Sequence, residues 1–413
     1  LRARREGAGC LEGQLRLGLQ LFARDMGDVG NNEVQVDWAF ADYRLSNELG
    51  LRLGKIKAPL GLYNESRDAD IVRTWVLLPQ SVYMEAWRSF VVAAEGGGIY
   101  GTLNAGPLGS FEYQDVLGTL GNFNTEESLL GKQFEKLLQP YAFTGQVITA
   151  DDVKVTGRKL NSMQLVWNTP LEGLRFSSTW TFGKTEAKVP AMTQYTWALY
   201  DSNADGIPDS PIFVPAYVHA GGGIYVPSGA YLPSLVKVDF PERSIDVSMK
   251  KALTVSGEYK WKGLTLAAEY IEEKIGVDYG MNTPALMTAL NIKLPRGVTL
   301  LGYYGSIAYR FTDWFELGTY YSVYYPNKSD KKGDDMIADA TKAQILTGSV
   351  AAVDHQAWQK DYCLTARFDI NPFWCVKLEG HHMNGTAQVY EYDDINDLRK
   401  VWTLYAVKTS FAF

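Results

Sequence analysis

Apolar and polar side chains alternate along most of the chain. In the segment 14–22, leucines occupy every second position, and Gln14, Arg16, Gly18 and Gln20 lie between them. The same alternation recurs at 34–41, 49–54, 174–182, 253–261, 315–323 and 374–378. Because successive side chains of a strand point to opposite faces, the pattern predicts β-strands with one apolar and one polar face.

Short and long connections alternate between these predicted strands. The short ones lie at 45–48, 106–109, 169–173, 262–263, 312–313 and 371–372, and the long ones at 58–88, 118–152, 185–243, 275–297 and 326–357. Bacterial outer-membrane barrels carry short periplasmic turns on one rim and long extracellular loops on the other. We therefore expect an all-β fold, a transmembrane antiparallel β-barrel, as a single domain over residues 1–413.

The strand number depends on the long outer loop at 185–243. We expect 16 strands if this segment hides a further hairpin of the barrel, and 14 as the alternative if it does not. Aromatic residues beside the predicted turns, including Tyr303, Tyr304, Trp314 and Tyr320, indicate girdles at the membrane surfaces. The segment 401–413 alternates up to Phe413, like the terminal strand of outer-membrane proteins. One helix is expected at 125–138.

Composition excludes several classes of protein. The chain contains no run of about 18 uncharged apolar residues, so spanning helices are not expected. A net charge of −7 argues against a nucleic-acid partner. With four histidines and no G-x-S-x-G motif, we expect no enzyme activity and no required cofactor, and His381 is interpreted as a lumen residue. Cys363 is expected opposite Gly380, which argues against a disulfide with Cys375.

One stretch of sequence resembles a known family. Residues 51–65 read LRLGKIKAPLGLYNE, and RDAD and LLPQSVY follow at 67–70 and 77–83. This resembles the G-[RK]-x-K-x-P-x-G pattern of bacterial outer-membrane porins related to the phosphate-selective porin group. The resemblance implies a barrel of about 16 strands, a homotrimer, and a loop folded inward to narrow the pore. Phosphate specificity does not follow, because the dense arginine and lysine ladders of that group are not found here.

Residues opposite the apolar stripe of each strand are expected to face the pore. Basic candidates outnumber acidic ones at these positions, and a positive lumen attracts anions, so a mild anion preference is expected. The alternative is that these charges pair across neighbouring strands and leave little net electric field in the lumen. The candidate pore-lining cations are Arg16, Arg52, Arg158, Arg175, Lys250, Arg310, Arg367 and Lys377.

The segment 58–88 is the expected pore-constricting loop. Pro59 and Gly61 end the preceding strand. Charges of both signs then follow, and on an inward-folded loop they would set up a transverse field across the pore. The alternative is an ordinary solvated outer loop. The charged residues proposed for the constriction are Glu65, Arg67, Asp68, Asp70 and Arg73.

A second motif lies in the long outer loop and is typical of calcium loops. It offers oxygen ligands at alternate positions, from Asp201, Asn203, Asp205, the Ile207 carbonyl and Asp209. The twelfth position is Ile212 rather than Glu, which excludes an EF-hand. A shorter D-x-[DN]-x-D-G loop with a structural calcium ion is expected, and an Asx-rich turn is the alternative.

These patterns predict a porin of a bacterial outer membrane. It would allow passive diffusion of small hydrophilic solutes, surrounded by outer-membrane lipid and lipopolysaccharide. Two alternatives remain open. One is a structural barrel or docking partner for other envelope proteins, and the other is an outer-membrane enzyme.

Overall fold

The computed structural model describes residues 9–11, 15–25, 32, 34–88, 93–120, 154–189, 191–197, 199–200, 210–211, 213–221, 224–233, 235–240, 242–278, 296–347, 352–389 and 397–412. The predicted helix at 125–138 and the calcium motif at 201–209 lie outside these residues.

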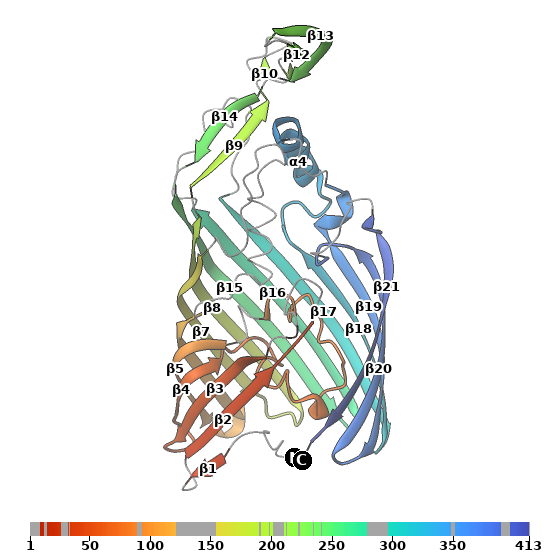
Figure 1. Ribbon diagram of the computed structural model, residues 1–413. Coiled ribbons are helices and arrows are strands. Elements are labelled where there is room, and N and C mark those ends of the chain that lie inside the picture. Colours follow the sequence, from red (N-terminus) through yellow and green to blue (C-terminus); the bar gives the residue numbers. More distant parts are fainter. Residues whose placement is uncertain are drawn as a thin grey trace.

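A single antiparallel sheet of 15 strands curves into a barrel (Figure 1). Each strand pairs with its neighbour in the chain, except that β8 pairs directly with β15. The strands are β1 (Gly9–Leu11), β2 (Leu15–Phe22), β3 (Gln35–Arg44), β4 (Gly50–Lys57), β5 (Ala93–Asn104), β6 (Ser110–Thr119), β7 (Lys154–Asn168), β8 (Leu174–Val189), β15 (Arg243–Trp261), β16 (Leu264–Asp278), β17 (Gly297–Thr312), β18 (Phe315–Tyr325), β19 (Gln359–Asn371), β20 (Trp374–Gly385) and β21 (Val401–Phe411).

The barrel therefore has 14 long strands and the three-residue β1. The 14-strand alternative is confirmed, and the expectation of 16 is wrong. The segment 185–243 does contain further strands, but they pair only with one another: β9 (Met192–Trp197) with β14 (Leu235–Phe240), β10 (Leu199–Tyr200) with β11 (Ser210–Pro211), and β12 (Phe213–Gly221) with β13 (Ile224–Pro233). Pro215 and Pro227 lie within β12 and β13, and a proline cannot donate to the ladder of a barrel strand.

The two rims of the barrel differ, as the alternation of short and long connections predicted. Short turns join β3 to β4, β5 to β6, β7 to β8, β15 to β16, β17 to β18 and β19 to β20, and β1 and the last residues of β21 lie on this side (Figure 1). The strand pairs β9–β14 and β12–β13 and helix α4 (Asp334–Thr347) lie at the opposite rim (Figure 1). The turn before Trp374 is shifted by one residue relative to prediction, and an irregularity follows between Asp369 and Asn371, so Cys363 lies opposite His381 rather than Gly380. Cys363 and Cys375 are free thiols, as expected.

The outer face of the sheet is apolar. Large exposed apolar side chains recur at every second position of the strands, among them Leu17, Leu19, Leu51, Leu53, Leu165, Phe176, Ile307, Leu364, Tyr405 and Val407. A continuous apolar band of this extent is compatible with lipid and not with water. Among the described residues, no helix is long and apolar enough to cross a membrane. The sheet is therefore a transmembrane barrel of the outer-membrane type.

Aromatic rings form contacts around the short-turn rim. Phe111 stacks on Trp167, Trp314 on Phe368, and Trp374 on Phe411. These contacts form the girdle expected at a membrane surface. Not all of the predicted girdle residues belong to it: Tyr304, Tyr320 and Tyr324 are buried on the inner face, because their even-numbered positions in β17 and β18 point inward.

Candidate functional site

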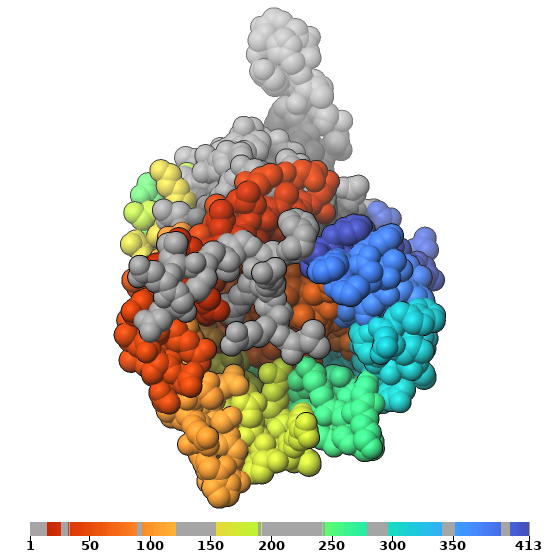
Figure 2. All heavy atoms as spheres, turned by 90° about the horizontal axis from the view of Figure 1, so that it is seen from below, coloured from red at the N-terminus to blue at the C-terminus, as the bar shows by residue number. Residues whose placement is uncertain are grey.

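Residues 58–88, which follow β4, lie inside the barrel (Figure 2). We call residues 58–88 the inner segment; it includes the short helix η1 (Asp70–Val72). Viewed from the short-turn rim, atoms in the orange of this part of the sequence are visible within the ring of strands (Figure 2). The segment makes hydrogen bonds to strands on both sides of the barrel, and this network fixes its position.

The inner segment leaves β4 through a turn that requires glycine. Gly61 has φ +52°, and a Cβ atom there would lie 2.4 Å from Glu269 Oε1. The main chain is held on both sides of this turn by β7, where Ser162 Oγ donates to Pro59 O (2.8 Å) and Gln164 Nε2 to Gly61 O (2.6 Å). A side chain at position 61 would displace the segment from this wall.

Glu269 of β16 is the most heavily bonded anchor. Its carboxylate accepts hydrogen bonds from Leu62 N (2.8 Å), Tyr83 Oη (2.5 Å), Tyr304 Oη (2.7 Å) and Ser256 Oγ (2.6 Å). Two of these donors belong to the inner segment and two to the barrel. A single buried carboxylate thus joins both ends of the segment to the wall.

Two further carboxylates, on β18 and β20, hold the middle of the segment. Glu316 of β18 accepts from Thr74 Oγ1 (2.5 Å). Glu379 of β20 accepts from the main-chain nitrogens of Val76 and Leu77, each at 2.8 Å.

Two cations complete this attachment, and both were predicted to line the pore. Arg367 and Lys377 donate to main-chain oxygens of the inner segment rather than facing free solvent. The acceptors are Ile71 and Arg73 for Arg367, and Asp70 and Trp75 for Lys377.

Ion pairs hold the inner segment to β3 and β4. Asp68 pairs with Lys57 (2.5 Å) and with Arg88 (2.6 Å), and Arg88 also pairs with Asp37. Burial alone would raise the pKa of Asp68, but Lys57 and Arg88 outweigh burial and hold that pKa well below its usual range. Asp68 therefore remains a carboxylate in this network.

This shift predicts a pH-dependent effect of Asp68. A carboxyl group whose pKa is lower in the folded than in the unfolded state stabilises the folded state fully above the unfolded pKa of about 4. This stabilisation is lost as the pH falls through the folded pKa. We expect the melting temperature of Asp68→Asn in detergent to lie below that of the wild type above about pH 5, and the difference to shrink below about pH 4. A difference that grows on acidification would contradict this assignment.

Part of the contact between segment and wall is apolar. One buried cluster joins side chains of the inner segment to side chains of β16–β19: Leu60, Trp75, Leu78, Val82, Tyr83, Ile271, Tyr304, Ala308, Tyr320 and Cys363. Water is excluded from this part of the lumen, so any solute path runs beside the segment rather than through it.

The predicted pore-lining residues separate into two groups. Arg16, Arg52, Arg175, Arg310, Arg367 and Lys377 lie on the inner face, each within an ion pair. Arg158 and Lys250 do not fit the alternation, because each occupies a β-bulge. Arg158 pairs with Glu186, whose buried neighbours Thr185 and Ala187 point inward, so this pair lies on the outer side. Lys250 is exposed.

Near the short-turn rim, inward cations other than Arg367 and Lys377 are more exposed than the carboxylates beside them. Arg16 is 38% exposed and its partner Asp42 0%, and Arg175 is 33% exposed and its partner Glu258 3%. The pairs of Lys260 with Glu258, Arg310 with Glu316 and Lys408 with Asp70 have the same asymmetry. In two ion pairs of the inner segment the carboxylate is the more exposed partner: Glu65 is more exposed than Arg52, and Glu85 is more exposed than Arg67.

Comparison with known proteins found similar solved structures at low sequence identity. No family model matches the chain, and no curated protein matches it. The chain is similar to the solved structures of outer-membrane expressed OmpT of Vibrio cholerae (9% identity, 98% of this chain and 86% of that chain, TM-score 0.45) and of the outer membrane channel DcaP of Acinetobacter baumannii (8%, 97% and 82%, TM-score 0.46). An anion-selective porin from Comamonas acidovorans is also similar (11%, 92% and 76%, TM-score 0.41). At these values the likenesses carry no argument about transport.

The constriction residues named from sequence lie in this network, but its main anchors were not identified as such. Glu269, Glu316 and Glu379 lie opposite the apolar stripes of their strands, a position that indicates the inner face but not a contact with the inner segment. Tyr83 gave no signal, since a tyrosine in a loop has no predicted orientation. The parity of Tyr304 could have distinguished it from the outward Tyr303.

Proposed function

We propose that this protein is a passive pore of a bacterial outer membrane, narrowed by the inner segment, for small hydrophilic solutes. The observation that carries the proposal is a charged, hydrogen-bonded segment fixed inside a barrel whose outer face is apolar. A fixed segment restricts the size of a solute without any moving part, and charged side chains beside it keep the remaining passage wet.

We also propose the mild anion preference. Arg16, Arg175, Lys260, Arg310 and Lys408 lie near the short-turn rim and expose more of their surface than their carboxylate partners. A permeating ion there meets the cation first, although the pairs contribute little net charge. Because Glu65 and Glu85 oppose this effect from the inner segment, the preference is expected to be weak.

The double variant Arg175→Gln with Lys408→Gln tests this preference. Each partner keeps another cation, Lys260 for Glu258 and Arg73 for Asp70, so folding is expected to survive. The reversal potential of the wild type in a salt gradient should lie on the anion-selective side, and that of the double variant should move toward zero or beyond. Lys184→Gln, on the outer face, is the matched control and should leave the potential unchanged. An unchanged potential in the double variant would contradict the proposed selectivity.

Further properties follow from the proposal. Outer-membrane lipid and lipopolysaccharide would surround the apolar face, and a homotrimer is proposed on the resemblance of residues 51–83 to porins. The mass of the protein in detergent measures its assembly. A structural barrel that docks other envelope proteins would share the fold and conduct no ions.

A further inference from the structure

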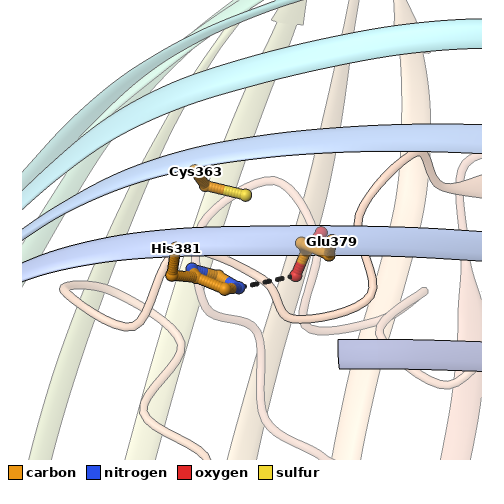
Figure 3. Close-up of side chains that lie close together, drawn as sticks. All are labelled: Cys363, Glu379 and His381. Atoms are coloured by element: carbon orange, nitrogen blue, oxygen red, sulfur yellow. Dashed lines mark hydrogen bonds and ion pairs between the residues drawn. The ribbon is translucent and has the colours of Figure 1, made fainter. Parts of the chain in front are cut away.

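Three side chains with metal-binding atoms meet on the inner faces of β19 and β20. They are Cys363, Glu379 and His381, and one ligand atom from each lies within 4.8 Å of the others (Figure 3). All three are buried. A thiol, a carboxylate and an imidazole in one buried group are the donors that zinc binds in proteins.

The sheet itself brings these residues together. Cys363 lies directly opposite His381 in the antiparallel ladder. Glu379 precedes His381 by two residues in β20 and therefore points to the same face. Neither a flexible loop nor a rearrangement of the backbone is needed to assemble the group.

The hydrogen bonds of His381 indicate a cation between two of these side chains. Its Nδ1 lies 3.1 Å from both carboxylate oxygens of Asp361, and its Nε2 lies 3.0 Å from Glu379 Oε1. If the neutral ring donates its one proton to Asp361, the lone pair of Nε2 faces a carboxylate oxygen. That contact is repulsive unless a second proton or a metal ion lies between the two atoms.

We propose that Cys363, Glu379 and His381 bind a divalent transition-metal ion of the zinc type. Asp361 would orient the imidazole, as the outer carboxylate does in carboxylate–histidine–metal arrangements. The Cys363 thiol would lose its proton to solvent as the metal–sulfur bond forms during folding, before the site closes. A thiolate ligand favours zinc or cobalt over calcium or magnesium.

The ion would also be linked to the inner segment. Glu379 accepts hydrogen bonds from the main-chain nitrogens of Val76 and Leu77, so a metal-bound carboxylate would hold both the wall and the segment. This site goes beyond the proposed pore function and does not require conductance.

Cobalt is the spectroscopic probe for the site. The full chain is folded in detergent with CoCl₂, freed of unbound ion, and examined for metal content and for absorption from thiolate-to-cobalt charge transfer. Folding in the presence of the ion is essential because the site is closed to solvent. We expect one cobalt ion per chain with the charge-transfer band, and the loss of both in Cys363→Ser and in His381→Ala.

The chain offers two matched controls. Cys375, on β20 opposite Asp369, is also a buried thiol. His382 is the outward-facing neighbour of His381. Cys375→Ser and His382→Ala should retain both the ion and the band. Heat-modifiable migration establishes that each variant is folded.

Three results would overturn the proposal. They are folded wild-type protein without cobalt, a band that persists in folded Cys363→Ser, and equal loss of the band in Cys375→Ser. The first result would favour a doubly protonated His381 that donates to both carboxylates. Because the readouts are metal content and absorption, a failure of pore conductance would leave this test unaffected.

Discussion

Replacing residues 62–87 by a short Gly–Ser linker is expected to raise the single-channel conductance several-fold. The inner segment fills part of the lumen with a buried cluster that includes Trp75 and Tyr83, and its removal returns that cross-section to water. The barrel should still fold, because its strands pair with one another independently of the segment. Planar-bilayer recording measures the change.

A matched deletion separates this effect from loop shortening in general. Removal of residues 213–233, the hairpin of β12 and β13, should leave the conductance unchanged, since these strands lie outside the barrel sheet. Equal conductance of the inner-segment deletion and the wild type would contradict the constriction.

Glu269→Gln should have the largest effect of any single substitution in the network. The variant places an amide N–H group against donors from Leu62, Tyr83, Tyr304 and Ser256, at least one of which then loses its acceptor. The cost of unsatisfied buried donors predicts a fall of about 2–4 kcal/mol in the free energy of unfolding in detergent.

Glu273→Gln is the control for this variant. Glu273 lies on the same face of β16, nearer the long-loop rim, and no hydrogen bond to its carboxyl group is found among the described residues, so the same substitution there should not lower stability. In Glu269→Gln we also expect noisier open-channel current, because the inner segment loses its principal anchor. Equal stability of the two variants would contradict the role of Glu269.

Periodicity predicted the strands well because it reports the one property that every barrel strand shares. Side chains of a strand between lipid and lumen must alternate, so the strands around Leu17 and Phe176 could be predicted from the sequence. The bulges at Arg158 and Lys250 could not be predicted in this way. One extra residue leaves the alternation on each side intact, but it exchanges the inward-facing and outward-facing positions beyond the bulge. The additional hairpins were not predicted to be separate from the barrel, although the prolines of β12 and β13 indicate that this pair stays out of it.

The direction of the inner segment could not be derived from its own residues. Charges such as Glu65 and Arg73 suit a solvated loop equally well. Their positions depend on partners more than 200 residues away along the chain, such as Glu269 for Leu62 and Glu316 for Thr74. Only the resemblance to porins indicated an inward course, and the local sequence gave no measure of how closely the segment packs against the wall.

The most direct test of the pore is single-channel recording from the purified wild-type protein in a planar bilayer, with folding verified by heat-modifiable migration. We predict discrete conductance steps with a reversal potential slightly on the anion-selective side of zero. Folded protein that inserts and produces no steps would contradict the pore, and would mean that the inner segment closes the barrel.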